Sequence, residues 1–593
     1  MPAIVVAVVV LALFAVAYLT YARYLASRVY ALDDSRPTPA HTMTDGVDFV
    51  PTNKHVLFGH HFTSVAGAAP IVGPAIAVFW GWGPALVWIV LGTIFAAGVH
   101  DFGALAVSVR HRAQNIGTLA GRVISRRGRT LFLVIIFFLL TLVNAVFAVV
   151  IGNLLVANPG AVIPIFVEIP VAMLIGQYIY RTRSAALVPS IVGVIALYLL
   201  ILVGQAFPLD ITPLATALGF ENPRNLWVII LFAYAFLASR LPVWLLLQPR
   251  DYINSHQLFI ALGVIMLGIV VGWERIVAPV VNEVPEGSPS IVPFLFITIA
   301  CGAISGFHSL VSSGTTSKQL DKESDARYVG YVGALGEGSL AMGSVLAVTA
   351  GVAATQVEWR ELYSDFATAS GGATGNFVGG VAEFANNLGV PLATATIFAA
   401  VVVISFAATT MDTGVRLQRY IVQEIAEIAG IRPLARNLTL AGLVAVGVPL
   451  VLALLPGGGE AGYTFGVLWQ LFGTTNQLTA ALALTVVAMW VLRRGRNPLA
   501  VLVPLVVVLA MTTWALLVNL RNFVTAGEWV LAALDAVILV LAMWLVVEAV
   551  AAVRHAREER ARGVDDPRHE ALGGTDDGDA VARQDAGGPG PAR

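Results

Sequence analysis

The segment His60–Ala77, HHFTSVAGAAPIVGPAIA, is apolar enough to lie in a membrane, but two glycines and two prolines interrupt it. A helix in lipid must satisfy its own backbone hydrogen bonds, and proline removes a donor and clashes with the preceding turn. The segment therefore predicts a locally broken helix, tolerated only where the freed backbone faces protein, water or a ligand. It is either half of a binding site or a kinked helix packed tightly against its neighbours. The interrupting residues are Gly67, Pro70, Gly73 and Pro74.

The composition excludes an ordinary soluble protein. Hydrophobic residues make up 58% of the 593 residues and charged residues only 12%, and the mean hydropathy is +0.81. Soluble domains carry about 25% charged residues, so we expect an all-α polytopic membrane protein. Cys301 is the only cysteine, which excludes a disulfide framework and a cysteine metal site. No basic segment precedes Ala3–Tyr21, so this stretch is expected to remain as a membrane helix.

Apolar runs of roughly 20 residues, enough to cross a core about 30 Å thick, mark the expected membrane spans. There are about fifteen such runs. They cover residues 3–22, 62–80, 84–104, 130–154, 161–180, 186–206, 226–247, 257–273, 291–311, 331–356, 391–412, 437–455, 465–490, 498–518 and 528–552. With the N-terminus outside, the inner segments hold nearly all lysines and arginines, which favours an N-out/C-in topology.

A second interruption, Ser239-Arg240-Leu241-Pro242, lies in a run of opposite orientation, five runs after the first. Two interrupted helices in corresponding positions of inverted halves are typical of secondary transporters built from a 5+5 inverted repeat. We therefore predict an inverted-repeat core with additional helices. The predicted divisions are an N-terminal membrane helix with an inner connecting segment (1–61), a first five-helix repeat (62–206), a second, inverted repeat (226–412), four additional membrane helices (413–552) and a disordered cytoplasmic tail (553–593).

The two interruptions are the predicted substrate site, because freed amides at a helix N-terminus favour an anionic group. Arg240 lies about fourteen residues into its run, roughly 20 Å deep at 1.5 Å per residue, and a guanidinium suits a carboxylate. The alternative is a structural ion pair between Arg240 and a buried carboxylate, with Asp412, Glu337 or Asp101 as its partner. The candidate substrate-binding residues are Ser64, Gly67, Pro70, Gly73, Ser239, Arg240 and Pro242.

A polar helix face, with Ser305, His308 and Ser312 at i, i+3 and i+7, predicts a second chemical group. Histidine titrates near neutral pH, and carboxylates in a low dielectric can exchange a proton during transport. Hydroxyls near a helix end can coordinate sodium. Each of these side chains is alternatively a structural hydrogen-bonding group. The candidate proton-coupling residues are His308, Glu337, Asp412 and Asp101, and the candidate sodium site is Ser312, Ser313 and Thr315.

Several enzyme classes are not expected. The sequence GTTSK lacks the spacing of a phosphate-binding loop, and no HExxH motif is present, so we predict neither ATP-driven pumping nor metal-dependent hydrolysis. No metal, organic cofactor or nucleic acid is expected, and a proton or sodium ion would be the coupling ion. The expected partners are a small-molecule substrate and the lipid bilayer, and the oligomeric state is open.

Six stretches resemble the CstA carbon-starvation protein family, over about residues 50 to 520. They are VLFGHHFTSVAGAAPIVGPAIA (56–77), VHDFGALAVSVRHR (99–112), LPVWLLLQPRDYIN (241–254), SGFHSLVSSGTTSKQL (305–320), SFAATTMDTGVRLQRYI (405–421) and LWQLFGTTNQLTAALAL (468–484). The resemblance implies a multi-pass transporter of the cell inner membrane with a LeuT-like core. Relatives take up peptides, or pyruvate together with a proton, under carbon starvation.

The expected function is therefore secondary active import of a small carboxylate nutrient, pyruvate or short peptides, by a cation-coupled symporter that uses a proton. A nutrient sensor on a transporter scaffold, binding its ligand without net flux, is the alternative.

Overall fold

A computed structural model of the chain describes every residue except 47, 124–125, 183–185, 243, 456–464 and 562–593. The described residues form helices joined by short turns, with two isolated bridges and no strand of a sheet among them. Eleven of these helices are long and apolar enough to cross a membrane, or twelve if one bent pair is a single span. The predicted class, an all-α polytopic membrane protein, is confirmed.

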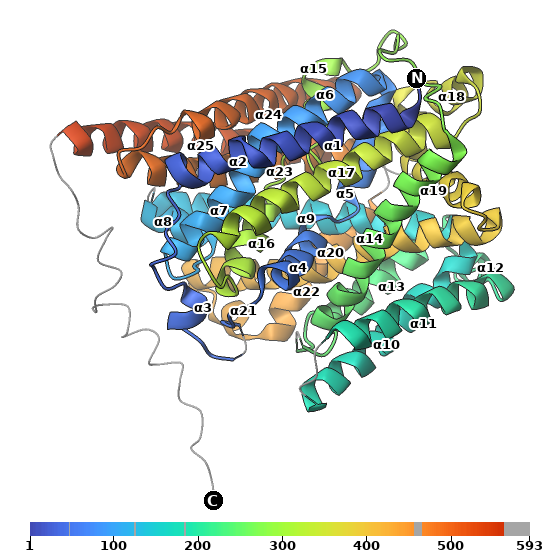
Figure 1. The fold of residues 1–593 in the computed structure, drawn as a ribbon, viewed down its shortest axis with the longest axis horizontal. Coiled ribbons are helices and arrows are strands. Elements are labelled where there is room, and N and C mark those ends of the chain that lie inside the picture. Colours follow the sequence, from blue (N-terminus) through green and yellow to red (C-terminus); the bar gives the residue numbers. More distant parts are fainter. Residues whose placement is uncertain (47, 124–125, 183–185, 243, 456–464, 562–593) are drawn as a thin grey trace, which may run out of the picture.

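The helices lie side by side along the long axis of the molecule (Figure 1). In the first half they are α1 (Ala3–Leu19), α2 (Tyr21–Tyr24), α3 (Pro39–Thr42), α4 (Lys54–Val65), α5 (Ala69–Ala77), α6 (Trp82–Gly92), α7 (Gly98–Arg110), α8 (Ile116–Val123), α9 (Arg126–Ala157), α10 (Val162–Thr182), α11 (Leu187–Ala206), α12 (Thr212–Ala217), α13 (Pro223–Ala238) and α14 (Leu247–Gly272). In the second half they are α15 (Ile291–Thr298), α16 (Phe307–Gly314), α17 (Val332–Leu346), α18 (Gln356–Leu362), α19 (Phe366–Asn387), α20 (Leu392–Ile428), α21 (Arg432–Arg436), α22 (Leu438–Leu454), α23 (Phe465–Arg493), α24 (Leu499–Ala526) and α25 (Trp529–Ala561).

The short helices α4, α5, α16 and α17 lie near the centre of the bundle (Figure 1). Around them, α9 packs along α20 and α23, and α7 packs against α16 and α23. The hairpin α10–α11 lies at one edge of the molecule, and α24–α25 at another. Helices α9 and α23 are themselves largely buried, so the broken helices beside them lie where irregular backbone is tolerated in a membrane protein.

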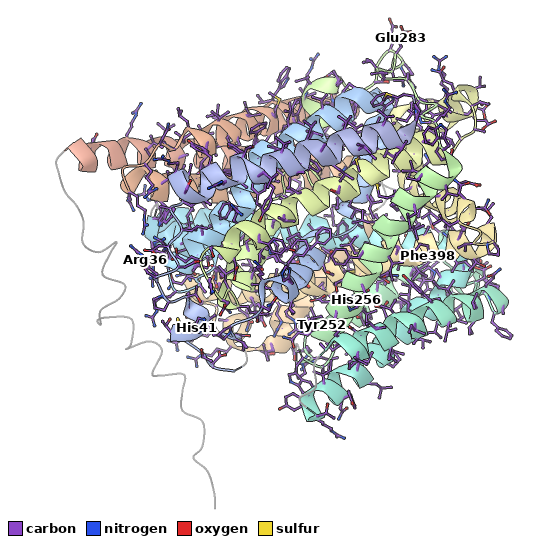
Figure 2. All side chains as sticks on the ribbon, viewed as in Figure 1. Arg36, His41, Tyr252, His256, Glu283 and Phe398 are labelled. Atoms are coloured by element: carbon purple, nitrogen blue, oxygen red, sulfur yellow. The ribbon has the colours of Figure 1, made fainter. Side chains whose placement is uncertain are left out.

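The segment that follows α2 is fixed to the end of the bundle. Figure 2 shows Arg36 and His41 at one end of the long axis, while Phe398 on α20 lies toward the other. His41 Nε2 is 2.9 Å from Asp321 Oδ1, and Thr38 donates to the Leu320 carbonyl at 2.6 Å. The connecting segment predicted within residues 1–61 is therefore packed against the chain that follows α16.

The first predicted interruption is present. Helix α4 ends at Val65 and α5 begins at Ala69, with a bend of 51° between the two halves. Pro70 lies in the first turn of α5, where its missing N–H costs no helical hydrogen bond. Gly67 lies against Thr410, and a Cβ on Gly67 would meet the threonine hydroxyl at 2.5 Å. The break therefore brings the backbone close to α20.

The second predicted interruption is present, but it ends a helix instead of dividing a membrane span. Residues 239–242 do not divide a span, because α13 ends at Ala238 and a new helix, α14, begins at Leu247. Proline disfavours helical geometry in the residue before it, so Pro242 helps to end the helix. The guanidinium of Arg416 donates to the Ala238 carbonyl at 2.9 Å and caps this helix end. The predicted runs 226–247 and 257–273 therefore had the wrong boundaries.

The second broken helix lies instead in the run 291–311, which the sequence analysis treats as one span. Helix α15 ends at Thr298 and α16 begins at Phe307, and residues 299–306 between them are not helical. Gly302 in this break has a φ of +94°, a conformation that favours glycine. No proline marks the break in the sequence, which is why the run was predicted to be continuous.

The last helix is longer than predicted. Helix α25 continues to Ala561, so residues 553–561 of the predicted disordered tail are helical. The rest of that predicted tail lies outside the described residues.

Candidate functional site

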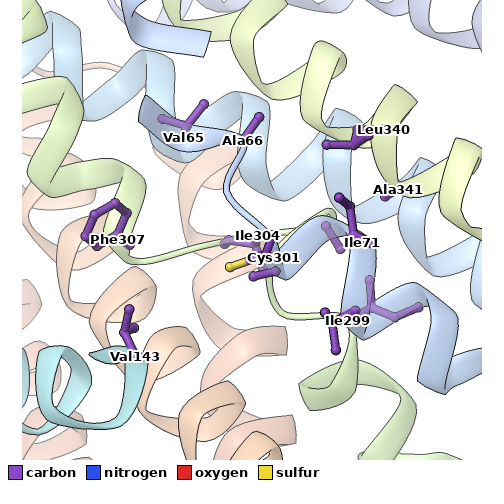
Figure 3. Close-up of a cluster of buried hydrophobic side chains, with 14 of the residues drawn as sticks. Val65, Ala66, Ile71, Val143, Ile299, Cys301, Ile304, Phe307, Leu340 and Ala341 are labelled. Atoms are coloured by element: carbon purple, nitrogen blue, oxygen red, sulfur yellow. The ribbon is translucent and has the colours of Figure 1, made fainter. Parts of the chain in front are cut away.

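The two helix breaks meet in the centre of the bundle. Helix α5 packs against α15 and α17. Gly73 lies directly on the Thr298 carbonyl, so close that a Cβ on the glycine would overlap it. Figure 3 shows Ala66 of the first break near Cys301 and Ile304 of the second. Small residues therefore allow the two broken helices to touch through their backbones.

A small cavity of about 20 Å³ lies where the breaks meet. Both breaks contribute to its wall, together with α9, α20 and α23. The lining residues are Val65, Gly67, Ala69, Val143, Phe147, Cys301, Ser305, Phe307, Thr410 and Phe472. A cavity of this size holds about one water molecule. The structure is therefore a closed conformation, in which the junction has no room for a nutrient molecule.

The cavity wall is apolar and uncharged, with three polar side chains. Phe147, Phe307 and Phe472 supply aromatic rings, and none of the ten lining residues carries a charge. The hydroxyl of Thr410 and the thiol of Cys301 face other protein groups, the Phe406 carbonyl at 3.0 Å and the Ser305 hydroxyl at 3.3 Å. An anion in this cavity would therefore have to be stabilised by backbone groups.

Two helices begin at the cavity. Helix α5 starts at Ala69 and α16 at Phe307, and both of these residues line it. The N-cap residues, Ala68 and Gly306, have no side chain able to accept a hydrogen bond from the first amides. A helix N-terminus carries a partial positive charge and unsatisfied N–H groups. The junction thus provides two positive helix ends in a wall without side-chain charge.

The predicted substrate residues of the first break lie at or near this junction. Gly67 lines the cavity, and Gly73 packs on the second break. Pro70 lies against Gly302, since a Cβ on Gly302 would be 3.6 Å from the Pro70 Cα. Ser64 is half-buried and donates to the His60 carbonyl of its own helix at 2.8 Å. The predicted residues of the first break therefore lie at or beside the junction of the two breaks, and their role in substrate binding stays a prediction.

The predicted residues of the other half lie elsewhere. Arg240 is exposed at the end of α13, with its guanidinium 5.6 Å from the centre of the Phe236 ring. Ser239 donates to the Phe236 carbonyl, and neither it nor Pro242 lines the cavity. The predicted depth of Arg240 is wrong because the helix ends two residues before it. Its predicted role as a ligand of the substrate carboxylate has no support in this geometry.

His308 lies in a fully buried cluster of ionisable side chains. Its Nδ1 is 2.8 Å from Asp101 Oδ2 on α7, and its Nε2 is 3.3 Å from Glu337 Oε1 on α17. The other oxygen of Asp101 is 2.6 Å from His100 Nδ1. None of the four residues exposes more than 1% of its surface. Three of the four predicted coupling residues therefore come together at the first turn of α16, where His308 follows Phe307.

Asp412, the fourth predicted coupling residue, belongs to a different cluster. Its Oδ2 is 2.7 Å from Arg250 Nη1 and accepts a hydrogen bond from Tyr234 at 2.8 Å. Glu168 Oε1 lies 3.6 Å from the same guanidinium. Arg250, Glu168 and Asp412 are each at most 2% exposed. This cluster joins α10, α13, α14 and α20, and the arginine that pairs with Asp412 is the buried Arg250 rather than Arg240.

The profile of the carbon starvation protein CstA family matches residues 2–359 and 351–515. The chain belongs to the CstA family. It is 32% identical over 562 residues to the peptide transporter CstA of Helicobacter pylori, covering 85% of this chain and 80% of that protein. It is 37% identical over 354 residues to the pyruvate/proton symporter BtsT of Escherichia coli, covering 58% of this chain and 48% of that one.

Solved structures with a similar arrangement include the Eremococcus coleocola manganese transporter in complex with an aromatic bis-isothiourea compound. The match covers 86% of this chain and 99% of that chain, at 14% identity and a TM-score of 0.45.

Two of the three candidate sodium ligands, Ser313 and Thr315, already make hydrogen bonds within the protein. Ser313 donates to the Ser309 carbonyl at 2.5 Å and accepts from the Ile116 amide at 2.9 Å. Thr315 is exposed and donates to the Val311 carbonyl. Ser312 is buried and has no hydrogen-bond partner among the described residues. The three hydroxyls therefore do not form a shared set of free ligands.

Sequence reasoning missed the contribution of α23 to the site of this CstA-family chain. Trp469, Asn476 and Gln477 all bond to the second break, although only the family resemblance drew attention to their stretch. The available signal was the polar run TTNQ (474–477) inside an apolar helix. Buried polar side chains in a membrane helix face a partner, and here the partner is the broken backbone of α15 and α16.

Proposed function

We propose that this protein is a proton-coupled secondary transporter that imports a small carboxylate nutrient, pyruvate or short peptides, across the cell inner membrane. The observation that carries the proposal is the cavity at which both helix breaks meet. Discontinuous helices that meet near the middle of a bundle are the usual binding sites of secondary transporters. The names of the relatives, a peptide transporter and a pyruvate/proton symporter, support the same class.

The substrate carboxylate would lie between the N-termini of α5 and α16. The positive ends of these two helices favour an anion, and the aromatic wall suits the apolar part of a small molecule. Because the cavity holds about one water molecule, substrate entry requires the bundle to open. Opening would move the broken helices and their partners α7 and α17 relative to α9, α20 and α23.

The inverted repeat is proposed with boundaries that differ from 62–206 and 226–412. The first half comprises α4–α5, α6–α7, α9, α13 and α14, and the second comprises α15–α16, α17, α20, α22 and α23. The packing supports this pairing in two ways. Helix α13 packs on α9 in the first half, and its counterpart α22 packs on α20 in the second. Helix α14 packs on the broken helix through α4, and its counterpart α23 packs on the other broken helix through α15 and α16. Hairpin α10–α11 would then be an insertion in the first half of a LeuT-like core.

The proposed topology is N-out/C-in, with fifteen crossings. It counts the short helices α13 and α22 and the two broken helices α4–α5 and α15–α16 as spans, in addition to the eleven long ones. The concentration of basic residues in the expected inner segments supports this orientation.

The coupling proton would be carried by the cluster of His308, Asp101 and Glu337. Its three helices, α7, α16 and α17, also pack around the broken segments, so a change of charge there acts directly on the site. Glu337 is held less tightly by histidine than Asp101, because its contact with His308 is 3.3 Å long while Asp101 has two shorter contacts with histidines. We therefore assign the exchanged proton to Glu337, and the aspartate to orienting the imidazole.

The test is uptake into proteoliposomes containing the purified protein. Labelled pyruvate and labelled di- and tripeptides are offered separately, each with an imposed pH gradient or an imposed sodium gradient. We expect accumulation of a carboxylate substrate under the inward proton gradient alone. Accumulation of none of them under either gradient contradicts the proposal, and saturable binding without accumulation supports a nutrient sensor instead.

A further inference from the structure

Three side chains of α23 hold the ends of the second helix break. Trp469 Nε1 donates to the Thr298 carbonyl at 3.0 Å, and Gln477 Nε2 donates to the Phe296 carbonyl at 2.6 Å. Both of these carbonyls belong to the last turn of α15, which has no following helical turn to satisfy it. Asn476, on the same helix, contacts the other end of the break.

Asn476 is completely buried and bonds to the N-terminus of α16. Its Oδ1 accepts from the Phe307 amide at 3.2 Å and from the Ser305 hydroxyl at 3.3 Å. Its Nδ2 lies 3.1 Å from Cys301 Sγ and 3.2 Å from Ser305 Oγ. Because a backbone N–H can only donate, the Phe307 amide fixes which end of the asparagine amide faces the helix.

The residues that Asn476 holds are residues of the cavity wall. Cys301, Ser305 and Phe307 all line the cavity, whereas Asn476 does not. Asn476 therefore fixes the geometry of the second break from outside the cavity, by bonding to residues that line it, and would not touch a molecule in the cavity.

The side-chain amide of Asn476 carries no charge, and this affects the electrostatic potential at the N-terminus of α16. An aspartate would be an equally good acceptor for the first amides of α16, and a negative charge at a helix N-terminus is normally stabilising. At this position, however, that charge would cancel the positive helix end and repel an anion in a cavity that has no charged lining residue. A neutral acceptor supports the helix and leaves its positive end available to a substrate.

We propose that Asn476 is a positioning residue that caps α16 with a neutral amide and thereby makes the cavity selective for anions. The inference rests on the proposed function, since it concerns the site of the same carboxylate. It deepens that function by naming a residue that supports the helix end at the site without adding a negative charge to it.

The decisive variant is Asn476→Asp, because it keeps the size and the acceptor, replaces the Nδ2 donor by an oxygen and adds a negative charge. We expect KM for the transported carboxylate to rise at least tenfold in proteoliposomes, while gel filtration and thermal melting show a folded protein. The ratio of the variant KM to the wild-type KM should fall as the pH is lowered, because a protonated aspartic acid is neutral. Asn476→Ala, which removes the cap, should lower the melting temperature and change KM less than Asn476→Asp does.

Asn519→Asp is the matched control, because Asn519 is a buried asparagine on α24 that does not line the cavity. We expect its KM to equal that of the wild type. An Asn476→Asp variant that folds and keeps the wild-type KM overturns the inference but leaves the proposed function intact. A wild-type protein that accumulates no carboxylate contradicts the proposed function itself.

Discussion

Among single residues, the buried carboxylates have different partners, and this separates their roles. Asp101 is fixed by two histidines and Asp412 by Arg250 and Tyr234, whereas Glu337 has a longer contact with His308 and the backbone of Gly302 beside it. A carboxylate that must release its proton in each transport cycle cannot be held permanently in its charged form. Glu337 fits this requirement best.

We predict that Glu337→Gln abolishes uphill transport but not binding. An amide cannot take up or release a proton, so accumulation driven by a pH gradient should fall at least tenfold, whereas exchange of labelled for unlabelled substrate should continue. Both are measured in the same proteoliposomes. Glu548→Gln on α25, where the carboxylate accepts from Trp544, is the control and should leave both activities unchanged. Continued accumulation by Glu337→Gln would show that this residue does not carry the proton.

The two arginines should respond differently to the same substitution. Arg250→Gln leaves Asp412 and Glu168 buried without their cation, a loss that costs about 3–5 kcal/mol when one partner of a buried pair is removed. Arg240→Gln changes an exposed side chain, and such changes usually fall within about 0.5 kcal/mol. Thermal melting in detergent should therefore show a large decrease for the first and almost none for the second. Loss of saturable uptake in a folded Arg240→Gln variant would restore its predicted role.

The sequence analysis identified individual residues most easily where an ionisable side chain lies in an otherwise apolar run. His308, Asp101 and Glu337 stood out as ionisable groups in apolar runs, and the structure brings them together. Arg240 was misplaced because its depth was counted from a helix boundary that the sequence does not mark. Arg250, which the sequence analysis did not single out, is 1% exposed and pairs with Asp412.

Among the helices, the two breaks depend on close backbone contact, and Gly73 is where that contact is tightest. We predict that Gly73→Ala separates α5 from α15, because the added methyl group would overlap the Thr298 carbonyl. Overpacking of this kind costs about 1–3 kcal/mol. The expected results are a lower melting temperature and loss of uptake.

Gly263→Ala is the matched control for that prediction. Gly263 lies within α14, and nothing lies within 4 Å of the position where its Cβ would be. Alanine in a helix is favoured over glycine by about 1 kcal/mol, so this variant should be at least as stable as the wild type. Equal melting temperatures and uptake for the two variants would mean that the contact at Gly73 has no structural importance.

Helix breaks were predictable only where proline marked them. The break at 66–68 precedes Pro70 and was predicted, whereas the break at 299–306 contains glycine but no proline and was missed. Glycine alone does not mark a break either, because the glycine-rich stretch 371–380 is helical within α19. Gly380 packs there directly on the Ala347 carbonyl, so tertiary contact overrides the weak helix propensity of glycine.

Across the entire bundle, sequence reasoning predicted the membrane class and the existence of broken helices, but not which helices correspond. Apolar length and charge distribution are local properties and can be counted along the chain. The proposed pairing of α13 with α22, and of α14 with α23, rests on packing between distant segments. In the proposed arrangement the hairpin α10–α11 is an insertion, which a count of spans along the sequence would not reveal.

The single cysteine makes the opening of the bundle measurable in the unmodified protein. Cys301 is 7% exposed and lines the closed cavity, so a thiol reagent can reach it only after the bundle opens. We predict that a small, membrane-impermeant methanethiosulfonate reagent labels reconstituted protein slowly, and that saturating substrate slows labelling at least fivefold by occupying the cavity. Mass spectrometry of the intact protein measures the rate, and Cys301→Ser should show no labelling. Labelling at the rate of a free thiol, or a rate that substrate does not alter, would contradict both the closed conformation and the location of the site.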